Sequence, residues 1–133
     1  MQYLLDTCMV SDFAQGRPEI LARVKAAAPE DLAVSALTEM EVAYGLLLNA
    51  KLARRLKPAM DAFFGAIRVL PYDRKAAEAS ANARASLKKR GRPIGAYDVL
   101  IAGTALAHAL ILVTSNVREF KQVEGLRVED WRA

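Results

Sequence analysis

The chain has 133 residues, of which 53% are hydrophobic and 26% are charged, which is enough apolar material for one packed core and excludes a disordered chain. A single cysteine and a single histidine exclude an internal disulfide and a structural zinc site of four Cys and His ligands. The net charge of +4 favours a polyanionic partner such as RNA, although many small domains are this basic.

No segment has the roughly 20 apolar residues of a membrane span, and the N-terminus lacks the basic start of a signal peptide. We therefore expect residues 1–133 to form a single soluble domain in the cytoplasm, with no membrane partner.

Short strands alternate with longer helices in the predicted secondary structure. Strands are expected at residues 3–5, 32–34, 67–70, 111–113 and 126–128. Helices are expected at residues 10–15, 19–28, 37–48, 51–65, 74–90 and 97–109. Strands joined by helices pair in parallel, so the pattern predicts an α/β fold, a three-layer α/β/α sandwich with a central parallel sheet of about five strands.

Polar residues follow several of these strands, where an open parallel sheet binds its ligands. Asp6 comes directly after the first strand, Ser35 after the second, and Thr114, Ser115 and Asn116 after the fourth. A carboxylate at the end of a buried central strand needs a cation or a hydrogen-bonding partner. Asp6 is therefore either a metal ligand or the N-cap of the next helix.

The helix at residues 37–48 separates its two glutamates. On a helical wheel, an apolar stripe faces the predicted core, and it consists of Leu37, Met40, Tyr44, Leu47 and Leu48. Glu41 falls at the edge of this stripe, whereas Glu39 is expected on the solvated face. Glu41 is either a surface residue or a site residue. Gly45 favours the second, because it costs about 1 kcal/mol of helix stability and suggests a close approach there.

Asp98 lies at the start of an otherwise apolar helix, after Pro93 and Gly95. It either stabilises the helix N-terminus or faces a cation. Three carboxylates that converge at one sheet edge, Asp6, Glu41 and Asp98, would suit magnesium, which prefers oxygen ligands. Magnesium at such a site supports phosphodiester hydrolysis.

Three other features have alternatives of their own. Cys8 would be a nucleophile only if it met His108, which is expected to be a packed histidine of an apolar helix. The run Arg54 to Lys57 is expected to be solvated. The basic cluster of Lys88, Lys89, Arg90 and Arg92 either complements a helix C-terminus or follows RNA phosphates.

With these residues identified, the chain resembles the PIN-domain toxins of the VapC family. The resemblance lies in five segments in the same order and spacing, namely LLDT at 4–7, TEMEVAYG at 38–45, GRPIGAYDVLIA at 91–102, LVTSNVREF at 112–120 and GLRVEDW at 125–131. The GRPIG and EDW stretches most resemble the branch that cleaves initiator tRNA.

The resemblance implies an endoribonuclease toxin that depends on Mg²⁺ or Mn²⁺ and cuts a tRNA, forms a homodimer and is inhibited by a VapB antitoxin. It implies that Asp6 and Asp98 ligate the metal, that Glu41 holds the metal or its water, and that Asn116 helps to position them. Thr7, Thr114 and Ser115, with the basic cluster at residues 88–92, are then expected on the substrate side. Cys8 stands where the family usually has Asn, and Asn116 where it often has Asp.

Two other functions compete with a nuclease. A non-catalytic RNA-binding or scaffold domain would retain the fold without cleavage, and Cys8 and Asn116 are the features that favour it. A phosphate-accepting regulatory domain would need a lysine after a late strand. The fourth strand is followed instead by Thr114, Ser115 and Asn116.

Overall fold

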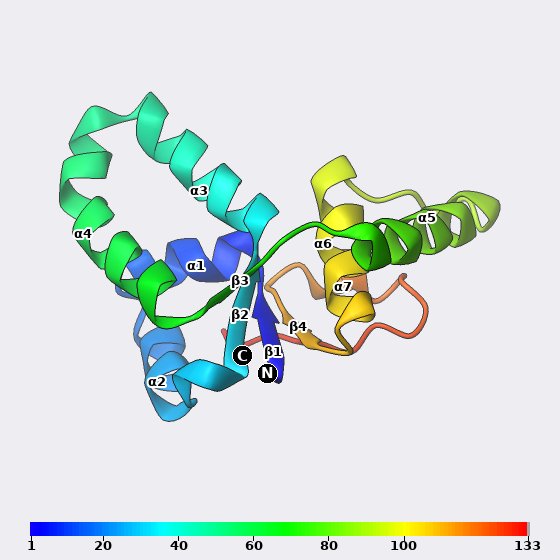
Figure 1. The fold of residues 1–133 in the computed structure, drawn as a ribbon, viewed down its shortest axis with the longest axis horizontal. Helices are drawn as coiled ribbons and strands as arrows, with labels where there is room; N and C mark the ends of the chain where they lie inside the picture. The colour runs from blue at the N-terminus through cyan, green and yellow to red at the C-terminus, as the bar shows by residue number, and fades with distance from the viewer. Residues whose placement is uncertain (133) are drawn as a thin grey trace.

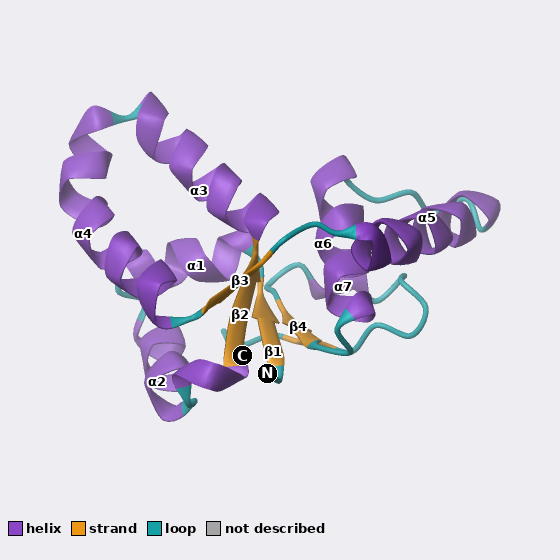
Figure 2. Cartoon of the chain, in the orientation of Figure 1, coloured by secondary structure: helices purple, strands orange, loops and turns teal. Residues whose placement is uncertain are grey.

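A five-stranded parallel sheet forms the centre of the computed structural model, which describes residues 1–132 (Figures 1 and 2). The strands are β1 (Tyr3–Leu5), β2 (Leu32–Ser35), β3 (Arg68–Leu70), β4 (Ile111–Val113) and β5 (Val128–Glu129). Their order across the sheet is β3-β2-β1-β4-β5, and every neighbouring pair is parallel. The expected α/β sheet is confirmed, with β1 at its centre.

Helices cover both faces of this sheet. They are α1 (Thr7–Ala14), α2 (Pro18–Ala26), α3 (Ala36–Leu48), α4 (Ala50–Ala66), α5 (Arg74–Lys89), α6 (Ala96–Ala107) and α7 (Val117–Phe120), with a 3₁₀ turn at Pro29–Asp31. Helices α1 to α4 lie on one side of the sheet and α5 to α7 on the other (Figure 1). None of the helices within residues 1–132 is long and apolar enough to cross a membrane.

Neighbouring residues of β1 contribute to the two different cores. Leu4 packs with Leu87 and Ala102 beneath α5 and α6, whereas Leu5 packs with Met9 and Phe63 beneath α1 and α4. Successive side chains of a strand point to opposite faces, so a strand covered on both faces is apolar throughout. This explains why the three inner strands β1, β2 and β4 are short and almost entirely apolar.

The boundaries of some elements differ from those predicted. Helix α1 begins at Thr7 rather than near residue 10, because the Asp6 carboxylate caps it by accepting from the backbone N–H of Met9 at 3.1 Å. Strand β5 covers only Val128 and Glu129, and the short helix α7 was not predicted at all.

The apolar stripe predicted to face the core from α3 is largely exposed, and that prediction is wrong. Tyr44, Leu47 and Leu48 have 60%, 85% and 70% of their surface accessible, and Met40 is exposed as well. Helices α3 and α4 form a hairpin that extends away from the sheet (Figure 1), so nothing in residues 1–132 covers this face.

The inward face of α3 lies about half a turn away. Thr38 is fully buried, and Val42 and Leu46 pack against the second core. Glu39 is exposed, as expected, and Glu41 is half-buried. Gly45 has no close neighbour, because a Cβ there would have no atom within 4 Å. The argument from Gly45 to a close approach is therefore wrong.

Candidate active site

Asp6 is the most buried carboxylate of the site, with 6% of its surface exposed at the end of the central strand β1. Its Oδ1 accepts a hydrogen bond from the backbone N–H of Met9 at 3.1 Å and one from the Cys8 thiol at 2.9 Å. Burial raises the pKa of Asp6, while hydrogen bonds from Cys8, Thr114 and the backbone oppose that rise. The N-cap interpretation of Asp6 is confirmed, and the cap uses Oδ1. The metal-ligand interpretation stays a prediction.

Cys8 connects the end of β1 to the end of β4. Its Sγ lies 3.2 Å from the Ser115 Oγ and 3.9 Å from the Thr114 Oγ1. Burial and the neighbouring Asp6 charge raise the pKa of the Cys8 thiol. The thiol therefore stays protonated at neutral pH and acts as a hydrogen-bond donor to Asp6, not as a nucleophile.

Glu41 reaches the site from α3 and is held by α1. The Thr7 hydroxyl donates to the Glu41 Oε1 at 2.7 Å and lies 3.3 Å from the Thr38 hydroxyl. The start of α3 is itself fixed by Ser35, whose Oγ accepts from the backbone N–H of Thr38 at 3.1 Å. One hydrogen-bonded chain therefore joins the ends of β1 and β2 and aims Glu41 at the sheet edge.

Asp98 and Glu119 form an acidic pair near Asp6 and Glu41. Asp98 lies in the first turn of α6, and Glu119 belongs to α7. The Glu119 Oε1 accepts from the backbone N–H of Gly95 at 2.8 Å, and its Oε2 accepts from the Asn116 side-chain amide. A Cβ at Gly95 would lie 3.0 Å from the Asp98 Oδ2, so a larger residue there would require the Asp98 carboxylate to shift by a few tenths of an ångström.

The charges of this region repel one another. The pKa of Asp98 is raised to about 6 by burial first, then by the charge and hydrogen bond of Glu119, and then by the charges of Asp6 and Glu41. Within residues 1–132, none of these four carboxylates has a Lys or Arg at ion-pair distance. Repulsion between these like charges would be relieved by a bound cation.

The donor set fits a hard divalent metal. Asp6, Glu41, Asp98 and Glu119 offer carboxylate oxygens, which Mg²⁺ and Mn²⁺ prefer, and the nearby Thr and Ser hydroxyls add further oxygens. In the described part of the chain, no three Asp, Glu, His or Cys side chains already converge on one ligating point. Magnesium usually keeps several waters and takes one or two carboxylates, so a bound ion would not need three of these side chains at once.

The other predicted site residues divide into two groups. Thr7, Thr114 and Ser115 lie among the carboxylates, with the Thr114 Oγ1 accepting from the backbone N–H of Asn116 at 2.9 Å. Asn116 is exposed, and its amide is directed to Glu119 rather than to Asp6. Asn116 therefore contacts the pair of Asp98 and Glu119 only through Glu119.

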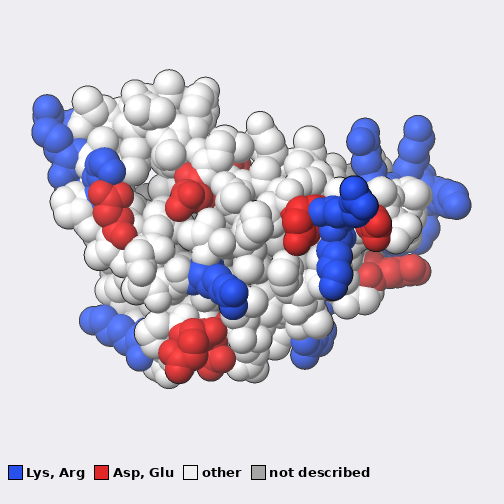
Figure 3. All heavy atoms as spheres, viewed as in Figure 1, with Lys and Arg blue, Asp and Glu red and all other residues white. Residues whose placement is uncertain are grey.

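The basic cluster lies at the far end of α5, where blue side chains gather at the right of Figure 3. Arg90 donates to the backbone carbonyl of Gln122 at 2.5 Å, and Arg92 donates to the Gln122 side chain at 3.3 Å. Arg92 and Glu119 border the same shallow pocket of about 370 Å³, whereas Lys88, Lys89 and Arg90 do not line it. Lys88 and Lys89 complement the last turn of α5.

Glu119 is the acid that the sequence analysis missed. One signal was available, because Asn116 and Glu119 have the spacing of a capping box at the start of a helix. His108, in contrast, ends α6, and a rise of 1.5 Å per residue puts it about 15 Å along the helix from Asp98. It is half-buried, as expected, and the contacts of Cys8 are with Asp6, Thr114 and Ser115 instead.

Comparisons with known proteins agree with this geometry. The PIN-domain family model matches residues 3–126. The tRNA(fMet)-specific endonuclease VapC of Salmonella typhimurium is 34% identical over 98% of both chains, and the ribonuclease VapC2 of Haemophilus influenzae is 37% identical over 98% of both. The crystal structure of DNA-bound VapBC from Salmonella typhimurium superposes with a TM-score of 0.91 and 34% identity over 98% of both chains.

Proposed function

This chain belongs to the PIN-domain family, among the VapC ribonucleases, and we propose that it is a magnesium-dependent endoribonuclease toxin that cleaves a tRNA. One observation carries the proposal beyond family membership. Burial and the charges of Glu119, Asp6 and Glu41 all raise the pKa of Asp98, and none of these four carboxylates is paired with a Lys or Arg in the described residues.

The proposed metal ligands are Asp6 and Asp98, with Glu41 holding the ion or its water. Magnesium at this position would lower the pKa of a water molecule and neutralise phosphate charge. Mn²⁺ offers the same octahedral oxygen chemistry, so either ion would serve.

The side chains around the proposed metal would hold the carboxylates in place and accept a proton from the attacking water. Thr7 occupies the Oε1 of Glu41, so the Oε2 has no hydrogen-bond partner in residues 1–132 and is free to accept a proton from an attacking water. Cys8 and the Met9 backbone hold one oxygen of Asp6 in place. Gly95 and Asn116 fix Glu119 beside Asp98, which keeps the second acid pair rigid.

The relatives suggest the substrate and the partner. A tRNA(fMet)-specific endonuclease matches the chain over 98% of both lengths, so initiator tRNA is the substrate to test first. Because tRNA is found in the cytoplasm, the proposed site of action is the cytoplasm. VapBC complexes are structural neighbours, so a VapB-type antitoxin is the proposed inhibitor. We also propose that the toxin acts as a homodimer and that residues 1–133 form one domain.

The direct test is cleavage of purified initiator tRNA by antitoxin-free protein with Mg²⁺, Mn²⁺ or EDTA. We expect a single cut with either ion, none with EDTA, and a loss of at least about 100-fold in Asp6→Asn and Asp98→Asn. Asp61→Asn is the matched control, because Asp61 is exposed on α4 and pairs only with Lys57. Tight, salt-sensitive tRNA binding without cleavage in any metal would favour the non-catalytic RNA-binding domain instead.

A further inference from the structure

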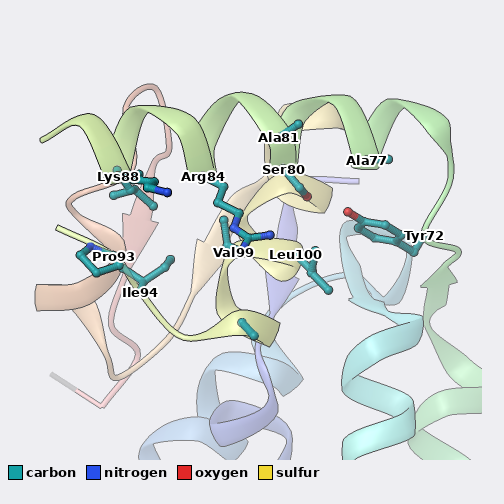
Figure 4. Close-up of a pocket in the computed structure, with 12 residues that line it drawn as sticks. Tyr72, Ala77, Ser80, Ala81, Arg84, Lys88, Pro93, Ile94, Val99 and Leu100 are labelled. Carbon is teal, nitrogen blue, oxygen red and sulfur yellow. The ribbon is translucent and has the colours of Figure 1, made fainter. Parts of the chain in front are cut away.

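A cavity of about 670 Å³ lies between α5 and the start of α6, outside the carboxylate cluster (Figure 4). Cavities of about 300–1,000 Å³ are the usual size of small-molecule sites. None of Asp6, Glu41, Asp98 and Glu119 lines it. It nevertheless begins beside the site, because Val99 in its wall directly follows Asp98 in the chain.

The walls of this α5–α6 groove combine an aromatic ring, apolar side chains and two cations. Tyr72 projects into one end from the loop before α5, and Val99 and Leu100 form the apolar floor (Figure 4). Arg84 extends from α5 over the middle of the groove, and Lys88 lies at the other end. Neither cation has an acidic side chain at ion-pair distance within residues 1–132.

A buried hydroxyl without a partner also lines the groove. Ser80 has 4% of its surface exposed, and its Oγ makes no hydrogen bond with any described residue. Such groups are rare because an unsatisfied buried hydroxyl costs stability. A Cβ at Gly103 would lie 1.9 Å from this Oγ, so the glycine allows α5 and α6 to approach closely at the bottom of the groove.

We propose that the α5–α6 groove binds one unstacked nucleotide of the RNA next to the cleaved phosphate. The proposal rests on the proposed ribonuclease function and assigns a subsite to it. The base lies against Tyr72 and the apolar floor, and Arg84 with Lys88 contacts the flanking phosphate. Proteins distinguish RNA sequences mainly in this way, by stacking unpaired bases on aromatic rings and hydrogen-bonding their edges.

Steady-state cleavage of initiator tRNA with Mg²⁺ provides the first test, in Tyr72→Leu and Arg84→Gln variants that keep the wild-type circular dichroism spectrum and melting temperature. Each variant should lower kcat/KM about tenfold, mainly through KM. Tyr44→Leu on α3 and Arg55→Gln on α4 are matched controls, because both residues are exposed and lie outside the groove. Equal kinetics in variants and controls would overturn the subsite.

The second test does not need cleavage. An RNA octamer that contains 5-bromouridine is photocrosslinked to the wild-type protein in EDTA, and the attached peptide is identified by mass spectrometry. Crosslinking at Tyr72 supports the subsite even if no RNA is ever cut, in which case only the proposed catalytic function fails. Crosslinks confined to other surfaces overturn the subsite while leaving the nuclease intact. A change of oligomeric mass in Tyr72→Leu, measured by light scattering, would identify the groove as a contact between copies and overturn it as well.

Discussion

Asp98→Asn should stabilise the metal-free protein, because it removes one of the mutually repelling charges of the site. The pKa of Asp98 is raised from 3.8 to about 6 by burial and by Glu119, Asp6 and Glu41, in that order. A rise of this size corresponds to at most about 3 kcal/mol. Asp98 is partly exposed and lies at a helix N-terminus that favours anions, so screening and the helix dipole reduce the expected gain to about 1 kcal/mol.

The pH dependence follows from the direction of the shift. A carboxyl group with a folded-state pKa above its unfolded-state value binds more protons in the folded protein between the two values. The free energy of unfolding of the wild type should therefore fall as pH rises from about 4 to about 6, and the loss is complete above about 6. The Asn variant lacks this loss, so its advantage should grow over the same interval and then stay constant.

Urea denaturation in EDTA at a fixed protein concentration, at several pH values between about 4 and 8, measures this difference. Asp61→Asn controls for the change of net charge, because Asp61 is exposed and its pair with Lys57 is worth a few tenths of a kcal/mol. Saturating Mg²⁺ should reverse the order, because metal at 100 times its Kd adds about 2.7 kcal/mol to a protein that binds it. A stability difference independent of both pH and Mg²⁺ would refute the electrostatic argument for the site.

Two further predictions concern packing and the last turn of the chain. Gly103→Ala should destabilise the fold by about 1–3 kcal/mol, since its Cβ would lie 1.9 Å from Ser80 Oγ, whereas Gly45→Ala should stabilise it by about 0.5–1 kcal/mol in open space. Thermal melts of both variants test this, and equal effects would contradict the model of the α5–α6 contact. Arg132→Lys should lower the free energy of unfolding by about 0.5–1 kcal/mol, because a single ammonium cannot replace the two hydrogen bonds of 2.6 and 2.8 Å to Asp12. A chemical denaturation curve that matches the wild type would show that this pair contributes nothing.

The local signals in the sequence were sufficient for the sheet and for three of the four acids of the candidate site, Asp6, Glu41 and Asp98. Short apolar runs separated by amphipathic helices determine a doubly covered parallel sheet, because only such strands have apolar side chains on both faces. Asp6 and Asp98 could be found because each interrupts apolar surroundings at the end of a strand or the start of a helix. The apolar residues on either side of each acid indicate that it lies close to the core.

Tertiary structure alone decided the roles of Glu119 and of the two helical glycines. Glu119 belongs to the site because Gly95, which is distant in sequence, donates its backbone N–H to it. Gly45 and Gly103 both lie inside helices, yet only Gly103 has another helix within contact distance of its Cβ position. A helix-propensity scale gives the loss of helix stability that a glycine causes. It does not show whether a neighbouring helix packs too closely there for a larger residue.

The exposed side of α3 shows the same limit. Periodicity determines which residues share a helix face, and it correctly grouped Tyr44, Leu47 and Leu48. Whether a face is buried depends on what packs against it, and α3 instead turns Val42 and Leu46 towards the core. The sequence therefore determined the elements, their order and the acids at their ends. Only the three-dimensional packing decided which faces meet, because contacts between distant segments depend on the relative orientation of whole elements and have no local sequence signal.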